Sequence, residues 1–372
     1  MTSTNITPIV MPKWGLEMRE GTVQDWLVAE GGRIEVGQAL VDVDTDKISN
    51  AVEATDAGLL RRIVAQSGET LPVKALLGVL AEADVSDAEI ADYIAAYEVP
   101  AAGSDEEDAG PAFEYADVDG IRVRYARRGP EEGTPVLFIH GFGGDLNNWL
   151  FNLDAVAEKH PVIALDLPAH GQSMVKLAGT TLKAQAAFIG KFMDVIGVAS
   201  AHLVGHSMGG GVAAQIAVDA PQKAASLALI DSAGFGDEVN ADYTDGFVRA
   251  DSRRELKPVA ELLFADTALV SRQLLDDLLK YKRLDGVSEA LGALGTQLFG
   301  GGKQSEQPGK ALGSFGRPVL VIWGSKDQVI PSSHATAAPA GAKVELLDGA
   351  GHMPQMEKAN EVNALLRQHL NQ

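Results

Sequence analysis

Ser207, Asp327 and His352 are residue types that together support acyl transfer through a serine, and they occur in that order along the chain. Ser207 lies in the pentapeptide Gly-His-Ser-Met-Gly at residues 205–209, a pattern typical of a sharp turn between a strand and a helix. A serine hydroxyl is a weak nucleophile unless a base takes its proton and a third group orients that base. We expect His352 to be the base and Asp327 to fix its tautomer.

The residues around Ser207 indicate how developing negative charge would be stabilised. Gly205 and Gly209 allow a turn tight enough to hold Ser207 in a strained, exposed position. The helix that follows would direct its positive N-terminal end at the site. We expect the backbone N–H groups of Met208 and Phe142 to form the oxyanion hole.

Other acids and histidines compete for these roles. Asp231 also stands at the end of a predicted strand, and we favour Asp327, which follows the last-but-one predicted strand. His140 and His206 are each tied to a Gly-flanked turn and are expected to form framework or pocket lining, whereas His170 is expected to hold a loop. The chain contains no cysteine, which excludes a thiol nucleophile, and we see no metal-ligand spacing.

Lys47 is the second residue whose setting indicates chemistry. It lies in VDVDTDKISNAVEA at residues 41–54, where alternation on both sides of a short polar turn predicts a β-hairpin with Lys47 at its tip. A lysine held there reaches far into solvent and suits covalent attachment of a prosthetic group. An ordinary solvated surface lysine is the alternative.

Short apolar runs, each ending in a turn-rich polar segment, supply the strands that would position the serine, aspartate and histidine. Such runs are typical of strands buried on both faces of a parallel sheet, and helical stretches between them indicate an open α/β sheet. A longer insert at about residues 235–315 is expected to form a cap over the carboxyl edge of the sheet. The apolar runs occupy residues 135–144, 161–173, 201–211, 224–234 and 317–327, and the helical stretches 182–197 and 212–220.

The preceding part of the chain has a different composition. Ser86 and Glu89 form a capping-box pattern, which predicts a short helix over residues 86–97. Residues 99–112 are rich in Pro, Ala, Gly and acids and are expected to be a linker. We therefore expect a first domain at residues 1–83, the helix and linker at 84–112, and a catalytic domain at 113–372.

The chain has a formal net charge of −20 over 372 residues and no basic stripe to neutralise phosphates, so we expect no nucleic-acid partner. Thirteen acidic residues and no Lys or Arg lie between Ala75 and Ile121. This block indicates a solubilising linker surface or a docking surface for a basic partner subunit. We find no signal peptide and no long apolar segment, and we expect a cytoplasmic protein that does not enter a membrane.

Residues 4–83 resemble the lipoyl domains of 2-oxo acid and acetoin dehydrogenase complexes. Biotinyl domains share that fold but usually carry Met-Lys-Met, which Asp46-Lys47-Ile48 does not match. The resemblance implies an all-β flattened barrel or sandwich with lipoate covalently attached to Lys47. The matching positions are Met11-Pro12, Gly15, Met18, Glu20-Gly21-Thr22, Gly31-Gly32, Val36-Gly37 and Asp44-Thr45-Asp46-Lys47.

Residues 113–372 resemble the α/β-hydrolase superfamily, which implies an α/β-hydrolase fold with a helical cap and the triad Ser207, Asp327 and His352. The resemblance rests on His-Gly after the first apolar run, on Asp166-x-Pro168-x-His170-Gly171-x-Ser173, on the pentapeptide around Ser207, and on Asp327 and Gly351-His352.

Together the two halves resemble the dihydrolipoamide acetyltransferase component of an acetoin dehydrogenase complex. The resemblance implies transfer of an acetyl group from the lipoyl arm on Lys47 to coenzyme A. It also implies two partners, the thiamine-diphosphate acetoin dehydrogenase subunits that load the arm and a dihydrolipoamide dehydrogenase that reoxidises it. The chain lacks the His-x-x-x-Asp-Gly segment and the peripheral subunit-binding domain of common 2-oxo acid acyltransferases, and its homo-oligomeric state stays open.

Two other functions fit parts of the sequence. One is an esterase, thioesterase or C–C hydrolase with an attached lipoyl domain, and the other is a lipoyl carrier or scaffold with a non-catalytic hydrolase fold. The sequence does not locate a coenzyme A site. Basic residues of the cap would either meet its phosphates or be solvated charges on amphipathic helices, and these are Arg249, Arg253, Arg254, Lys280, Lys282 and Arg283.

Overall fold

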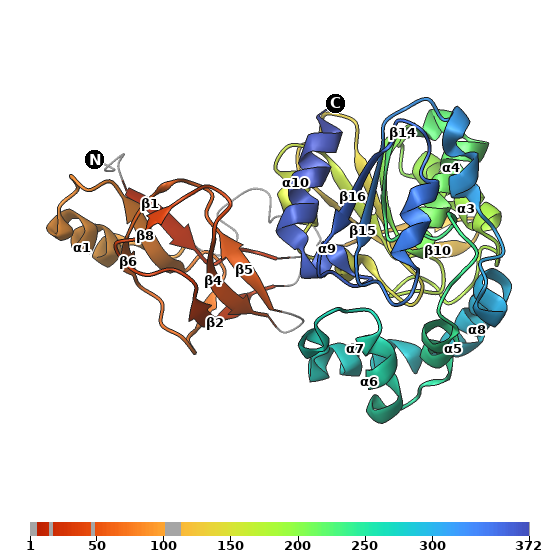
Figure 1. Ribbon diagram of the computed structural model, residues 1–372, viewed down its shortest axis with the longest axis horizontal. Coiled ribbons are helices and arrows are strands. Elements are labelled where there is room, and N and C mark those ends of the chain that lie inside the picture. The colour runs from red at the N-terminus through yellow and green to blue at the C-terminus, as the bar shows by residue number, and fades with distance from the viewer. Residues whose placement is uncertain (1–5, 15–17, 46–48, 101–112, 372) are drawn as a thin grey trace. The chain divides into compact units, whose positions relative to one another are not determined.

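The computed structural model describes residues 6–14, 18–45, 49–100 and 113–371. The chain divides into two compact units, residues 1–110 and 111–372 (Figure 1). Each unit has its own buried hydrophobic core.

The first unit is a β-sandwich of two four-stranded sheets. The sheet orders are β1-β8-β6-β3 and β5-β4-β2-β7. Fully buried Val23 and Val43 from one sheet pack in one core with Leu60 and Leu77 from the other, which confirms the predicted all-β domain. The strands are β1 (Ile6–Val10), β2 (Glu20–Trp26), β3 (Arg33–Ile34), β4 (Ala39–Asp44), β5 (Ser49–Glu53), β6 (Gly58–Ile63), β7 (Thr70–Pro72) and β8 (Leu76–Ala81).

The predicted hairpin around Lys47 is formed by β4 and β5. The two strands pair antiparallel with Asp44 opposite Ser49, so the short connection between them contains Lys47. Residues 46–48, and therefore Lys47 itself, lie outside the described residues. Helix α1 (Asp87–Ala96) ends this unit and begins at the capping box that Ser86 and Glu89 predict.

The second unit is built on one eight-stranded sheet with the order β16-β15-β14-β13-β11-β12-β10-β9. Strands β11 to β16 are parallel to one another, as the buried apolar runs predict, whereas β9 and β10 form an antiparallel hairpin at one edge. The strands are β9 (Glu114–Val118), β10 (Ile121–Arg128), β11 (Val136–Ile139), β12 (Val162–Leu165), β13 (Ala201–His206), β14 (Ala224–Ile230), β15 (Val319–Gly324) and β16 (Lys343–Leu347).

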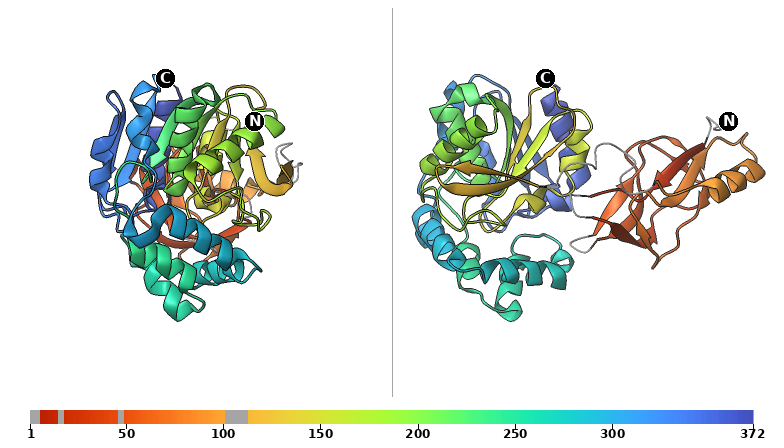
Figure 2. Two further views of the ribbon diagram at one scale, coloured as in Figure 1. Left: turned by 90° about the vertical axis from the view of Figure 1, so that its right-hand side faces the viewer. Right: turned by 180° about the vertical axis from the view of Figure 1, so that it is seen from behind.

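Helices pack on both faces of this sheet and around its carboxyl edge (Figures 1 and 2). Helix α3 packs on α4, and α10 packs on α2 and α9. The insert between β14 and β15 contains four helices and forms the cap. The covering helices are α2 (Leu153–Ala157), α3 (Leu182–Val195), α4 (Met208–Asp219), α9 (Pro354–Glu357) and α10 (Ala359–Leu370), and the cap helices are α5 (Ala241–Arg249), α6 (Arg253–Glu261), α7 (Arg272–Lys282) and α8 (Val287–Phe299). Among all described residues, no helix combines the length and apolar character needed to cross a bilayer.

A buried ion pair organises the carboxyl edge of the sheet. Arg124 Nε on β10 donates to Asp166 Oδ2 at 2.7 Å, and both side chains are almost completely buried. The Asp166 carboxylate also accepts the backbone N–H groups of Leu146 and Gln172, so it joins strand β10 to the segments that follow β11 and β12. Burial, and next the charge of Asp145, raise the pKa of Asp166 to about 6, although Arg124 opposes that rise.

Replacing Arg124 is expected to destabilise the second unit strongly. Arg124→Met leaves the Asp166 carboxylate buried without its cation, and removal of one partner of a buried pair costs about 3–5 kcal/mol. Urea unfolding at pH 7 measures the loss. Arg249→Met is the control, because the Arg249–Asp245 pair is exposed and its removal should cause no measurable loss. Equal stability of the two variants would contradict this role for the buried pair.

Candidate active site

Ser207 occupies the turn between β13 and α4, as its pentapeptide predicts. Its backbone has φ 54° and ψ −121°, a conformation that a residue with a side chain rarely adopts and that costs on the order of 1–3 kcal/mol. Gly209 allows the turn to pack against the end of the neighbouring strand β11, because a Cβ atom at this position would overlap the carbonyl groups of Ile139 and His140. The sequence therefore places the serine on a strained turn that its close packing maintains.

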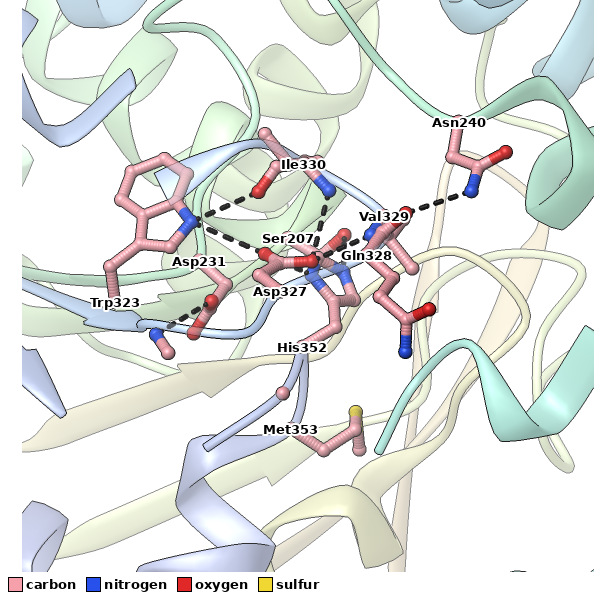
Figure 3. Close-up of polar contacts among 12 residues, drawn as sticks. Ser207, Asp231, Asn240, Trp323, Asp327, Gln328, Val329, Ile330, His352 and Met353 are labelled. Carbon is pink, nitrogen blue, oxygen red and sulfur yellow. Dashed lines mark hydrogen bonds and ion pairs between the residues drawn. The ribbon is translucent and has the colours of Figure 1, made fainter. Parts of the chain in front are cut away.

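Ser207, His352 and Asp327 form one hydrogen-bonded chain (Figure 3). The distance from Ser207 Oγ to His352 Nε2 is 2.9 Å, and the distance from His352 Nδ1 to Asp327 Oδ2 is 2.8 Å. The expected exposure of Ser207 is wrong, because only 6% of the residue is accessible. The ring of Tyr243 from the cap lies 6.4 Å from the His352 ring, and the backbone at Gly141 lies against Ser207. These neighbours account for the low exposure of both catalytic side chains.

Asp327 is held as a carboxylate by donors on both of its oxygens. Oδ1 accepts the backbone N–H groups of Val329 at 2.7 Å and Ile330 at 3.0 Å. Oδ2 accepts the Trp323 indole N–H at 3.2 Å in addition to the bond from His352. Burial by itself would raise the pKa of Asp327, but the charge and hydrogen bond of His352 and the other donors outweigh burial and lower that pKa. Asp327 therefore stays ionised and can orient His352.

His206 fixes the backbone of the segment that carries His352. Its Nε2 atom lies 2.7 Å from the carbonyl oxygen of His352 and donates to it, while the N–H of His352 donates to the carbonyl of Leu263 in the cap at 2.9 Å. Burial lowers the pKa of His206 to about 3, which keeps its imidazole neutral. His206 thus lies in a framework position, as the sequence predicts.

Phe142 and Met208, the residues expected to form the oxyanion hole, both lie in segments next to Ser207. Met208 begins α4, so its N–H has no partner within the helix, and a Cβ atom added to Gly141 would lie 2.9 Å from Ser207 Cβ. The loop that carries Phe142 is thereby placed beside the nucleophile. Tyr243 Oη donates to the carbonyl of Phe142 at 3.2 Å and connects this loop to the cap.

His140 and His170 support the loops around the nucleophile. His140 Nε2 accepts the N–H of Leu167 at 2.9 Å, so its Nδ1 carries the proton and donates to the carbonyl of Gly141 at 2.8 Å. His170 Nδ1 donates to the carbonyl of Pro168 at 3.0 Å. Burial lowers the pKa of His140 to about 4 and the pKa of His170 to about 3.

The basic residues of the cap have different surroundings. Arg253 pairs with Asp276, and Arg249 pairs with Asp245 at 3.2 Å, both near the surface. Lys282 is buried, and its ammonium group donates to the backbone carbonyls of α5 at Phe247 and Val248. Lys282 therefore connects α7 to α5 and is not available as a phosphate ligand. Sequence reasoning missed this role because a lysine on an amphipathic helix is usually solvated.

Comparison with known proteins gives the same two parts as the structure. Residues 134–359 match the family model described as alpha/beta hydrolase fold, and residues 7–80 match the model described as biotin-requiring enzyme. The second unit is also similar in fold to a meta-cleavage product hydrolase from Pseudomonas fluorescens, with a TM-score of 0.63, 22% identity, and coverage of 69% of this chain and 97% of that chain. The protein is an α/β hydrolase-fold protein that carries a biotinyl/lipoyl-type domain.

Two relatives match over nearly the whole chain. A protein from Cupriavidus necator is 67% identical over 99% of this chain and 98% of its own length, and one from Pseudomonas putida is 48% identical over 98% and 100%. Each is named the dihydrolipoyllysine-residue acetyltransferase component of an acetoin cleaving system. The chain therefore belongs to the family of these acetyltransferase components, which confirms the resemblance noted in the sequence.

Buried neutral histidines make the stability of the second unit depend on pH. The pKa values of His140, His170 and His206 lie at about 4, 3 and 3 in the folded chain, well below the ordinary value of 6.5. The unfolded chain therefore binds more protons below pH 6.5, and stability falls as the pH falls through this window. Asp166 and Asp231 act in the opposite direction, because burial raises the pKa of each carboxyl.

Lowering the pH from 7 to 5 is expected to destabilise the second unit selectively. Each of the three histidines contributes a loss of about 2 kcal/mol, and the two carboxyls offset part of it, which leaves a net loss of a few kcal/mol. Hydrogen exchange in urea, followed by mass spectrometry, resolves the two units. Residues 1–110 contain no histidine and are the internal control. A loss of similar size in both units would contradict this explanation.

Proposed function

We propose that this protein transfers an acetyl group from S-acetyl-dihydrolipoyl-Lys47 to coenzyme A in acetoin catabolism, through an acyl intermediate on Ser207. The observation that carries the proposal is the hydrogen-bonded chain from Ser207 through His352 to Asp327 in a protein that also contains a lipoyl-type domain. Family membership supports the acetyl group and the lipoyl donor, since both relatives are named for that reaction.

The first unit fits covalent attachment of lipoate at Lys47. Strands β4 and β5 pair up to Asp44 and Ser49, so the connection that contains Lys47 is short and its ends are held by the sheet. The flanking Asp42 and Asp44 are at most partly buried, as expected at the solvated end of a hairpin. Lipoate there would supply a thiol that carries the acetyl group as a thioester.

The first half of the reaction would form the acyl-serine. Ser207 Oγ attacks the thioester carbonyl carbon while His352 Nε2 takes the hydroxyl proton, and Asp327 stabilises the imidazolium that results. The backbone N–H groups of Phe142 and Met208 hold the oxyanion, and each such donor is worth about 10²–10³ in rate. Collapse breaks the C–S bond, and His352 returns the proton to the departing thiolate. Ser207 then carries the acetyl group.

The second half would repeat these steps with the coenzyme A thiol as the nucleophile. His352 accepts the thiol proton as the new C–S bond forms, and collapse of the second oxyanion breaks the bond to Ser207 Oγ, which regains its proton from His352. The triad serves water equally well as an acceptor, so exclusion of water decides between transferase and hydrolase. The low exposure of Ser207 and His352, 6% and 1%, supports transfer.

The proposed partners are a thiamine-diphosphate-dependent acetoin dehydrogenase that loads the carrier and a dihydrolipoamide dehydrogenase that reoxidises it. This assignment rests on the reaction, because acetyl transfer leaves the carrier as a dithiol that must be oxidised and reloaded. The names of the two relatives, which describe a component of a cleaving system, agree with other subunits acting beside this one.

Replacing Ser207 tests the route directly. Ser207→Ala is expected to lower acetyl transfer from S-acetyl-dihydrolipoamide to coenzyme A by at least about 10³-fold, because no oxygen is left to form the acyl intermediate. Appearance of acetyl-coenzyme A is measured by chromatography, together with release of free acetate. Ser325→Ala, a serine in the loop after β15 whose hydroxyl bonds to Asp348, is the matched control.

Three outcomes would contradict the proposal in different ways. Full transfer by Ser207→Ala would favour direct attack of one thiol on the thioester, with no acyl-serine. Acetate release that does not depend on coenzyme A in the unaltered protein would favour an esterase or thioesterase. A Ser207→Ala, His352→Ala variant could also be combined with the proposed acetoin dehydrogenase and dihydrolipoamide dehydrogenase. Full formation of acetyl-coenzyme A from acetoin by that mixture would favour a carrier or scaffold with a non-catalytic hydrolase fold.

Lys47 is expected to carry the prosthetic group. The first unit contains three lysines, Lys13, Lys47 and Lys74, which allows a matched comparison at constant charge. Intact-mass analysis of Lys47→Arg, produced with lipoate and the attachment enzymes of the host, should lack the increment of one lipoyl amide. The Lys13→Arg, Lys74→Arg variant should keep it. An increment retained by Lys47→Arg would place the attachment elsewhere.

A further inference from the structure

Asp231 is a buried acid of the second unit that the triad does not use. It follows β14, the strand between β13, which precedes Ser207, and β15, which precedes Asp327. The residue is completely buried, and its backbone has φ 43°, a left-handed conformation that asparagine and aspartate tolerate better than most residues. Its N–H donates to the carbonyl of Ile322 at 2.9 Å, so the strand pairing fixes its position.

The two oxygens of the Asp231 carboxyl have different surroundings. Oδ1 accepts the backbone N–H of Gly324 at 3.0 Å, whereas Oδ2 is buried and receives no hydrogen bond from any described donor. The carboxyl groups of Asp231 and Asp327 and the His352 imidazole all lie within 4.8 Å of one another, and Figure 3 shows Asp231 beside Asp327. An oxygen that faces another carboxylate makes a favourable contact only if a proton lies between them.

Asp327 is the member of this pair that stays ionised, because its oxygens accept two backbone N–H groups, the Trp323 indole and His352. Among the residues that the structure describes, the Asp231 carboxyl accepts one backbone N–H, that of Gly324, and forms no ion pair. Burial, followed by the charge of Asp327, raises the pKa of Asp231 well above its ordinary value. Two adjacent buried carboxyls do not both ionise, and the one with fewer donors retains the proton.

We propose that Asp231 is a positioning residue of the acyl-transfer site: its protonated carboxyl donates a hydrogen bond to the Asp327 carboxylate, and it becomes the orienting anion for His352 when Asp327 is made neutral. The inference rests on the proposed function, because it concerns the same site. The proposal adds Asp231 to the triad as a fourth residue. Asp231 follows β14, the strand that lies between the strand before Ser207 and the strand before Asp327. In this arrangement Asp231 helps to hold the Asp327 carboxylate that orients His352.

The other titratable groups around Asp231 are few. The charge of Glu357 on α9 acts on Asp231, but within the described part of the chain its carboxylate accepts the N–H groups of Gly351, Ala265 and Asp266 and forms no hydrogen bond with Asp327. The His352 imidazole lies within 4.8 Å of the Asp231 carboxyl and is bonded to Asp327. Glu357 therefore adds negative charge near Asp231 but does not bond to Asp327. Replacing Glu357 is a suitable control for replacing Asp231.

The experiment measures the rate at which a fluorophosphonate probe labels Ser207 in the full-length protein between pH 5 and pH 9. This reaction needs the triad but neither coenzyme A nor the lipoyl group, so a failure of the proposed acetyl transfer leaves the test intact. Asp231→Asn keeps an acceptor for the Gly324 N–H and a donor for Asp327. The probe should label Ser207 of this variant at a rate within about threefold of that of the unaltered protein, with the same pH profile. Asp231→Leu removes both and should label at least about 30-fold more slowly.

A second comparison does not depend on the folding of the leucine variant. In Asp327→Asn the neighbouring carboxylate is gone, so Asp231 should lose its proton at a lower pH than in the unaltered protein, and labelling should rise with pH. In Asp327→Asn, Asp231→Asn this rise should disappear, with a rate at pH 8 at least about tenfold lower. Asp327→Asn, Glu357→Gln should keep the rising profile, which distinguishes the specific contact from general charge.

Two results would overturn the proposal. If Asp231→Asn labels as slowly as Asp231→Leu, or shifts the pH profile by one unit or more, the carboxyl is needed in its ionised form. If Asp327→Asn and Asp327→Asn, Asp231→Asn have the same profile, Asp231 does not orient His352. Agreement of both comparisons with the expected rates and profiles would establish the positioning role.

Discussion

The parallel pairing of four neighbouring strands is the constraint on which the site depends. Strands β13, β14, β15 and β16 lie side by side, and each ends at the same edge of the sheet. One polar residue follows each strand, in the order Ser207, Asp231, Asp327 and His352. Backbone hydrogen bonds across the sheet therefore bring the four segments that carry these side chains to one edge, and the hydrogen bonds of the site complete the arrangement.

Burial makes this arrangement rigid and also makes it costly to assemble. Asp166, Asp231 and Asp327 are all withdrawn from water, and each is compensated differently: by an arginine, by a proton and by a histidine with backbone donors. An uncompensated carboxylate at any of these places would destabilise the fold by several kcal/mol. The same polar groups that position the nucleophile thus belong to the core of the unit, so loss of activity and loss of stability should be separated by experiment.

Sequence reasoning was most successful where a pattern is local. Continuous apolar runs predicted the parallel strands, alternation predicted the β4–β5 hairpin, and glycine spacing predicted the strained turn at Ser207. It did not predict β9 and β10, because exposed Arg122 and Arg127 interrupt the buried residues of β10 at this edge of the sheet. It also missed the Arg124–Asp166 pair and the burial of Ser207, because both depend on contacts between segments far apart in the chain. Asp231 was recognised only as a rival to Asp327, since spacing does not tell which of two acids keeps its proton.

The burial of Ser207 has a consequence for selectivity. A hydroxyl on a residue that is only 6% exposed is reached by a narrow group and is blocked to a broad one. A hydroxyl buried in this way would favour acyl donors of small cross-section over broad ones. A long unbranched tether satisfies such a filter, whereas the same acyl group on a bulky alcohol does not. Carrier-bound substrates would in this way be separated from the free esters of the cell by shape alone, without a dedicated contact for the carrier.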